Sequence, residues 1–223
     1  TAGSTEWPVE VSIAASALKN GSEVITGNVP VGYEVVEVGG VWKVIKSELW
    51  ELVSTADELV AALESNKSVI FANDIEQADG VVITDKNITI DLNGKTYTVT
   101  EGASTNNRNF TINGSSEVTI KNGTMVAAGD YSSGAYGTLR TEGTANVTLY
   151  DVKLYNYRGN GLNVKALSGT TVTITNTEIY SVYGGGVEAA GGTVELTNVK
   201  VEQKGMYTAP YNSMAISVNG GGQ

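Results

Sequence analysis

The chain has 223 residues, with 14 Lys and Arg against 24 Asp and Glu, which gives a net charge of −10. An acidic chain repels phosphate groups, so nucleic-acid binding is not expected, and no run of apolar residues is long enough to predict a membrane span. The chain contains no Cys and no His, which excludes disulfides, thiol nucleophiles, Cys/His zinc sites and histidine-based catalysis.

Residues 1–48 are predicted to form a small N-terminal β module. The sequences YEVVEV (33–38) and VWKVI (41–45) flank two consecutive glycines, which is the pattern of a β-hairpin closed by a primed turn. Such a module could dock or anchor the chain on a larger assembly. A purely structural cap or linker module is an equally good interpretation.

The sequence STADELVAALES predicts the one clear helix, over residues 55–65. Thr55 and Glu58 have the spacing of a capping box, and Leu59, Val60 and Leu63 form one apolar face. Because a stack of repeats needs a capping element at its end, we expect this helix to cover the first repeat. Residues 49–223 are then one capped repeat domain.

A short phrase of alternating apolar and polar residues recurs through the rest of the chain. Its copies are NITIDLNG (87–94), EVTIKNG (117–123), NVTLYDV (146–152), TVTITNT (171–177) and TVELTNV (193–199). The second apolar residue of successive copies is separated by 30, 29, 25 and 22 residues. Repeats of this length without intervening helices predict a β-solenoid, because a propeller blade would need a longer repeat.

The recurring phrase resembles the rungs of right-handed parallel β-helix proteins, the pectate-lyase-like superfold. The resemblance covers residues 68–218 and implies an all-β, right-handed parallel β-helix solenoid behind its capping helix. Proteins of this superfold include polysaccharide lyases and hydrolases, phage tailspikes and fibres, and bacterial surface adhesins. The resemblance is one of repeat pattern and does not choose among these functions.

Alignment of the last four copies predicts which residues share a column. An Asn or Asp occupies the expected tight turn, because these residues tolerate left-handed backbone: Asn122, Asp151, Asn176 and Asn198. Four apolar residues then face the core: Met125, Leu154, Ile179 and Val201. A third strand contributes further core residues: Phe110, Ile112, Leu139, Leu162, Val164, Val187, Met214, Ile216 and Val218.

Two outward columns and the adjacent connections form the candidate binding surface. Lys153, Glu178 and Lys200 are predicted to form an alternating charge ladder, and Tyr155 and Tyr180 to stack ring on ring. The connections 127–137, 156–161, 181–186 and 204–212 vary in length and contain Gly and Tyr. Tyrosine rings suit the apolar faces of sugars. The predicted ligand-binding residues are Tyr155, Tyr157, Arg158, Tyr180 and Tyr183. The alternative is that these tyrosines only pack the connections onto the solenoid or onto a neighbouring subunit.

Catalysis would require clustered carboxylates, with a metal ion or a basic residue beside them. The candidates are Asp130, Glu142, Asp151, Glu178 and Glu188. Asp151 belongs to the turn column, Glu178 to the charge ladder, and Glu142 and Glu188 are interpreted as partners of Arg140 and Lys165. No catalytic residue, metal site or cofactor is therefore predicted.

The leading hypothesis is a non-enzymatic structural or attachment protein at a virion surface or cell surface. The chain is similar in style to a phage fibre or spike component, whose N-terminal module docks on a capsid while the β-helix projects outward and binds a surface glycan. A homotrimer is expected by analogy with such fibres. A fragment of a bacterial cell-surface adhesin is one alternative, and a polysaccharide lyase or glycoside hydrolase is another.

Overall fold

The computed structural model describes residues 47, 49–100, 108–128, 137–157, 163–182, 185–204 and 215–223 in full, and five earlier strands by their backbone. Three of these strands, β1 (Val11–Ala14), β4 (Tyr33–Val38) and β5 (Val41–Lys46), form an antiparallel sheet in the order β1-β5-β4, and β2 (Lys19–Asn20) pairs with β3 (Glu23–Val24). The predicted hairpin is confirmed, because β4 and β5 pair from Tyr33 with Lys46 to Val38 with Val41. The division of the chain at residue 48 stays a prediction.

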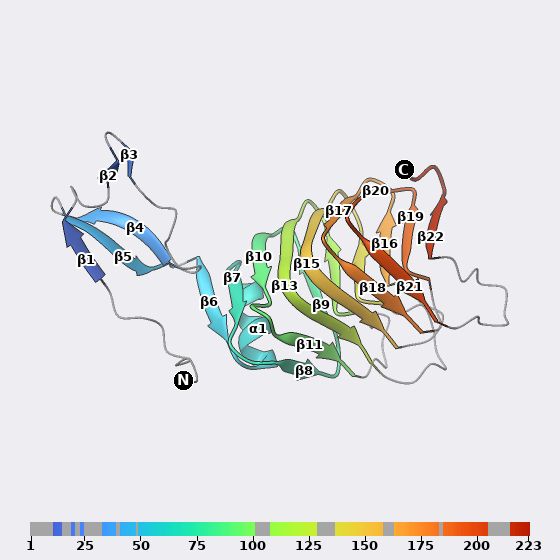
Figure 1. The fold of residues 1–223 in the computed structure, drawn as a ribbon, viewed down its shortest axis with the longest axis horizontal. Helices are drawn as coiled ribbons and strands as arrows, with labels where there is room; N and C mark the ends of the chain where they lie inside the picture. Colours follow the sequence, from blue (N-terminus) through green and yellow to red (C-terminus); the bar gives the residue numbers. More distant parts are fainter. Residues whose placement is uncertain are drawn as a thin grey trace.

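From Trp50 onward the chain winds into a parallel β-solenoid of about five turns, with the strands of successive turns side by side (Figure 1). Each turn contributes strands to three columns, which agrees with the predicted all-β solenoid. The first column contains β6 (Trp50–Val53), β7 (Ser68–Phe71), β10 (Asn87–Asp91), the first halves of β13 (Glu117–Ala127) and β15 (Asn146–Asn156), β17 (Thr171–Thr175) and β20 (Thr193–Thr197).

The second and third columns complete each turn, and every pairing within them is parallel. The second contains β8 (Ile75–Gln77), β11 (Thr96–Val99), the second halves of β13 and β15, β18 (Glu178–Ser181) and β21 (Lys200–Gln203). The third contains β9 (Val81–Thr84), β12 (Phe110–Asn113), β14 (Leu139–Thr141), β16 (Val164–Leu167), β19 (Val187–Ala190) and β22 (Ile216–Asn219).

Helix α1 (Ala56–Glu64) caps the first turn, as predicted. Thr55 is its N-cap and accepts a hydrogen bond from the Glu58 backbone, while the Glu58 side chain accepts from the Thr55 backbone, which completes the capping box. Leu59 and Leu63 are buried against the solenoid end. The alignment missed β6, which precedes the helix and pairs in parallel with β7, so the first column begins before the cap.

The turn between the first and second columns has the predicted left-handed residues. Positive φ values of 59°, 53°, 49° and 52° occur at Asn122, Asp151, Asn176 and Asn198. Asn and Asp adopt this conformation with less strain than other residues that carry a Cβ atom. The side chains of Asn198 and Asn176 are hydrogen bonded to each other, with 2.8 Å between Nδ2 and Oδ1.

A second left-handed column, which the alignment did not identify, lies between the third and first columns. It begins at Asp85 and continues through glycines whose φ values are positive: Gly114, Gly143, Gly169, Gly191 and Gly220. A Cβ atom on Gly143 would lie 2.8 Å from the Gly114 carbonyl oxygen, so the close approach of successive turns requires glycine here. The sequence does signal this column, because a glycine stands two or three residues before each of the last four copies of the phrase.

The interior is filled by apolar side chains from all three columns. The predicted core residues Met125, Leu154 and Ile179 are buried. An inner aromatic cluster fills the first turns and consists of Phe71, Tyr97 and Phe110, all fully buried. Its ring centroids are 6.0 Å apart for Phe71 and Tyr97 and 5.0 Å apart for Tyr97 and Phe110.

Ile216 and Val218 were predicted to be buried in the core. This prediction is wrong, because the two residues are 49% and 59% exposed. They belong to β22, the last strand of its sheet, so no further strand of the described residues covers them. Val201, in the last strand of the second column, is half-buried for the same reason. The predicted core residues Leu162 and Met214 lie outside the described residues.

Candidate functional site

The predicted outward columns are in register on the second column of strands. Val126 pairs with Tyr155, Tyr155 with Tyr180, and Tyr180 with Glu202. In the neighbouring column Lys153 pairs with Glu178 and Glu178 with Lys200. The two columns therefore lie side by side on one outer face, as the alignment predicted.

Three of the predicted site residues form one tyrosine cluster, namely Tyr155, Tyr157 and Tyr180. The ring centroids of Tyr155 and Tyr180 are 5.9 Å apart, and Tyr157 lies 6.1 Å from each of them. The predicted ring-on-ring stack of Tyr155 and Tyr180 is wrong, because their planes meet at 54°. The parallel pair is Tyr155 and Tyr157, whose ring planes are 3° apart. These residues are two positions apart in extended chain, so their side chains point to the same face of the sheet.

The tyrosine cluster is held by the solenoid wall, with Tyr157 exposed and Tyr155 and Tyr180 partly buried. The buried residue Asn156 lies between the two outward tyrosines, and the Tyr157 backbone N–H donates to the Ala127 carbonyl at 2.9 Å. Tyr157 is 44% exposed. Partial burial, followed by the proximity of Tyr155 and Tyr180, raises the pKa of Tyr157. Its phenol is therefore neutral at physiological pH.

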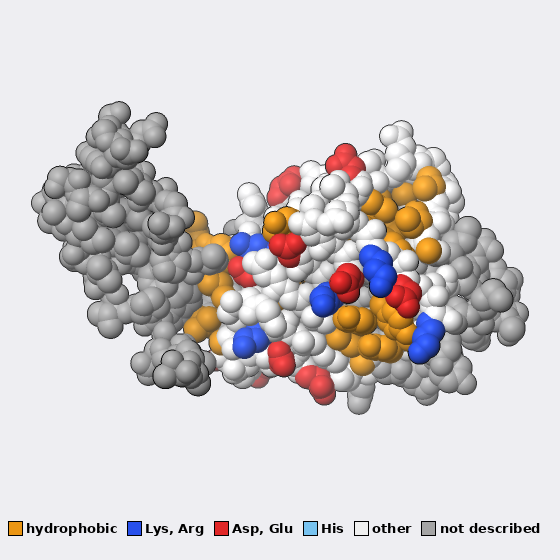
Figure 2. All heavy atoms as spheres, viewed as in Figure 1, with side chains coloured by type: hydrophobic (Ala, Val, Ile, Leu, Met, Phe, Trp, Pro, Cys, Tyr) orange, Lys and Arg blue, Asp and Glu red, His pale blue; other side chains and the backbone are white. Residues whose placement is uncertain are grey.

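The charged column beside the cluster does not form the continuous ion-pair ladder that the alternation suggested. Lys200 Nζ lies 3.2 Å from Glu202 on its own strand. Within the described residues Lys153, Glu178 and Lys200 are in register, but no ion pair joins any two of them. Figure 2 shows acidic and basic side chains beside a patch of hydrophobic side chains over β15, β18 and β21. The surface is therefore aromatic with polar, mixed-charge surroundings.

Two predicted site residues, Arg158 and Tyr183, lie outside the described residues, as do the other connection tyrosines. The structure brings together Tyr155 and Tyr180, from successive strands, with Tyr157 at the end of β15. The variable connections were predicted to protrude along one side, but most of their residues lie outside the described ranges.

The candidate catalytic carboxylates in the described residues have structural partners. Glu142 is paired with Arg140 Nε, and Glu188 Oε2 lies 3.0 Å from Lys165 Nζ while its other oxygen accepts from Asn219. The ion-pair interpretation of these two acids is confirmed. Asp151 occupies the turn column, as expected, and Asp130 lies outside the described residues.

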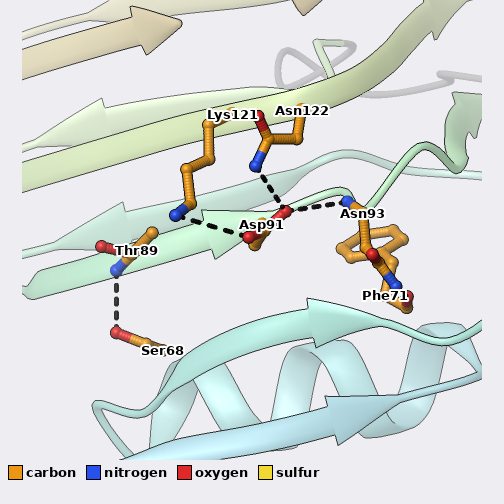
Figure 3. Close-up of polar contacts among 7 residues, drawn as sticks. All are labelled: Ser68, Phe71, Thr89, Asp91, Asn93, Lys121 and Asn122. Carbon is orange, nitrogen blue, oxygen red and sulfur yellow. Dashed lines mark hydrogen bonds and ion pairs between the residues drawn. The ribbon is translucent and has the colours of Figure 1, made fainter. Parts of the chain in front are cut away.

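A buried carboxylate that sequence reasoning missed is Asp91, which is 5% exposed at the end of β10 (Figure 3). Its Oδ1 atom accepts from the Asn93 backbone at 2.9 Å and from Asn122 Nδ2 at 3.2 Å, and its Oδ2 atom lies 3.4 Å from Lys121 Nζ. Asp91 thus ties two successive turns together. The available signal was an Asp in register with a Lys, since Asp91 pairs with Lys121 of the next copy.

Within the described residues no three acidic side chains are grouped so as to hold a metal ion, and no helix has the length and apolarity needed to cross a membrane. The arrangement defines a parallel β-solenoid with an aromatic outer surface. Comparison with protein families, curated proteins and solved structures found no match to this chain.

Proposed function

We propose that this chain is a non-enzymatic attachment protein whose solenoid binds a surface glycan through the tyrosine cluster. The observation that carries the proposal is a group of three adjacent tyrosine rings on an outer face of a regular solenoid, one of them exposed and two partly buried. In this proposal the N-terminal module docks on a larger assembly and the solenoid projects from it. A phage fibre or spike component, working as a homotrimer at the virion surface, fits this design, and a bacterial cell-surface adhesin is the alternative setting.

The physical basis is the match between aromatic faces and sugar rings. A tyrosine ring offers an apolar face and a polar tip, which suits a sugar with C–H groups on its faces and hydroxyls at its edges. Tyr155 and Tyr180 come from strands paired in parallel, so their backbone positions are fixed before a ligand arrives. Preorganisation of this kind reduces the entropy cost of binding. Exposed Lys153 and Glu178 would supply hydrogen-bonding groups at the rim.

A polysaccharide lyase or glycoside hydrolase is the second candidate. It is favoured by the two acid–base pairs, Arg140 with Glu142 and Lys165 with Glu188, on neighbouring strands of the third column. In each pair the base already neutralises the acid, whereas a catalytic acid or base must be able to exchange a proton with substrate. We therefore place the binding function first.

Incubation with a panel of bacterial and host polysaccharides tests both candidates, with retention and chain length as the two readouts. We expect retention of at least one polysaccharide without shortening. The Tyr155→Ala/Tyr180→Ala variant should bind it at least about fivefold more weakly, since an aromatic contact contributes about 1 kcal/mol.

Tyr150→Ala is the matched control, because Tyr150 is 42% exposed on the same strand but belongs to its first half, away from the cluster. Unfolding midpoints of all variants separate lost binding from lost folding. Release of short oligosaccharides would establish the enzyme instead. Unchanged retention by the double variant would remove the tyrosine cluster from the binding site.

A further inference from the structure

The three rings of the tyrosine cluster form a nearly equilateral triangle, with centroid separations of 5.9, 6.1 and 6.1 Å. A small group placed just above the centre of this triangle lies within roughly 6 Å of all three centroids, the range in which a cation is attracted to an aromatic ring. Tyr180 is inclined at 54° and 57° to the other two rings, so the triangle is not a flat platform. This geometry is more specific than sugar stacking requires.

Carboxylates flank the triangle. Glu202 is the in-register neighbour of Tyr180 on β21, and Glu178 stands two residues before Tyr180, on the same side of β18. Glu178 is exposed and makes no ion pair among the described residues, so its charge is available to a ligand. A carboxylate close to aromatic faces strengthens the attraction for a positively charged group.

Two lysines stand on this face: Lys153, two residues before Tyr155 on the same side of β15, and Lys200, which lies 3.2 Å from Glu202. Because Lys200 neutralises Glu202, Glu178 is the carboxylate of this face that remains open to a cationic ligand.

We propose that the tyrosine cluster selects glycans that carry a positively charged amine, and that the ammonium group lies over the ring triangle beside Glu178. This inference rests on the proposed glycan-binding function and narrows it to a class of ligand. The amine can come from an unacetylated amino sugar or from a quaternary ammonium substituent on the glycan, and the two share the same recognition chemistry.

The test compares two hexasaccharides that differ only in charge, the hexamers of glucosamine and of N-acetylglucosamine, at physiological ionic strength. We expect the glucosamine hexamer to bind at least about fivefold more tightly, and Tyr157→Ala to remove this preference. Tyr157→Phe should keep it, because the aromatic face remains. Tyr150→Ala leaves both the cluster and the net charge unchanged and should also keep it. Tetramethylammonium chloride should displace the glucosamine hexamer if a quaternary amine is an equally good ligand.

Because Tyr157→Ala does not alter the net charge of −10, it distinguishes the cluster from general attraction to an acidic protein. A preference that survives Tyr157→Ala, or no binding of the glucosamine hexamer at all, overturns the inference. Equal binding of the two hexamers, weakened in both cases by Tyr157→Ala, overturns the selection for amines but leaves glycan binding by the cluster intact. Since Tyr157 is 44% exposed, its replacement is not expected to unfold the chain.

Discussion

Within its described residues the solenoid carries two groups of three aromatic rings, the inner aromatic cluster and the tyrosine cluster, which have similar spacing but opposite surroundings. The centroids of neighbouring rings are 5.0 to 6.0 Å apart in the inner cluster and 5.9 to 6.1 Å apart in the outer one. The inner rings are completely buried, whereas Tyr157 on the outside is 44% exposed. Similar aromatic contacts therefore serve packing on one side of the wall and remain available on the other.

The two clusters also treat the phenol group differently. Tyr97, in the inner cluster, accepts a hydrogen bond from Gln77 Nε2 at 2.6 Å, and burial raises the pKa of its phenol. A buried phenol needs such a partner, because desolvation without a hydrogen bond is costly. In the outer cluster Tyr157 is 44% exposed, so solvent can satisfy its phenol without a fixed protein partner. Stability should therefore depend on the inner cluster and ligand binding on the outer one.

The largest expected effect is the loss of stability when the inner cluster is broken. Tyr97→Ala removes a fully buried ring and should lower the free energy of unfolding by about 3–5 kcal/mol. Tyr157→Ala, the matched outer change, should alter it by less than about 0.5 kcal/mol. Urea unfolding followed by circular dichroism measures both. Similar losses of stability for the two variants would mean that the tyrosine cluster also stabilises the fold. The division of roles between the inner and outer clusters would then be wrong.

Much of the wall could be predicted from the sequence because its chemistry is local. Asn122 and Asn176 stand at turns that need left-handed backbone, and Asn is one of the few residues that accept it. Alternation then assigns the face of every residue on the strand, so Tyr155 and Tyr180 could be placed outward and in register. The ring angles could not be predicted, because side-chain rotamers depend on neighbours from other strands.

Phe110 of the inner cluster was predicted to face the core, but Tyr97 was missed because the first turn is out of phase with the later ones. Four residues, 92–95, stand between the paired positions Asp91 and Thr96, where the next turn has only Asn122 and Gly123. Alignment on the recurring phrase therefore does not place Tyr97, although Tyr97 pairs with the core residue Met125. The glycine column was missed for another reason, since each glycine precedes the phrase that defined the alignment.

The glycine column sets the spacing of the turns that carry both clusters, and a side chain added there should have the next largest effect on stability. Gly143→Ala places a Cβ atom 2.8 Å from the Gly114 carbonyl oxygen at a φ of +71°, and should cost about 1–3 kcal/mol of unfolding free energy. Gly94→Ala is the control, because Gly94 has a φ of +75° but no atom within 4 Å of the added Cβ. Its cost should be smaller, about 1 kcal/mol of backbone strain alone.

These two glycine variants also test whether the spacing of the turns positions the tyrosine cluster. Gly143 lies just before β15, the strand that carries Tyr155, so a shift there should also weaken glycan binding by the tyrosine cluster. Gly94→Ala should leave binding unchanged. If both variants lose the same stability, strain at positive φ explains the column and the close approach of successive turns does not.

The smallest expected effect is a pH dependence at Asp85, which begins the glycine column. The Ser115 backbone N–H donates to Asp85 Oδ1 at 2.8 Å and the Ser115 hydroxyl lies 3.1 Å from the same atom, which lowers the pKa of Asp85 below its ordinary value of 3.8. Because the folded state favours the carboxylate, the stabilisation is fully present above the unfolded pKa and is lost as the pH falls through the lower folded pKa.

Asp85→Asn isolates this charge, since Asn also accepts the Ser115 hydrogen bonds and tolerates the φ of 54°. The unfolding midpoint of the wild type should exceed that of Asp85→Asn slightly at neutral pH, and the difference should vanish well below pH 3.8. The side chain is exposed, so solvent screening keeps the effect small. A difference that persists at low pH would show that the turn depends on the shape of the side chain. The left-handed start of the column would then be fixed by geometry alone, as it is at the glycines that follow.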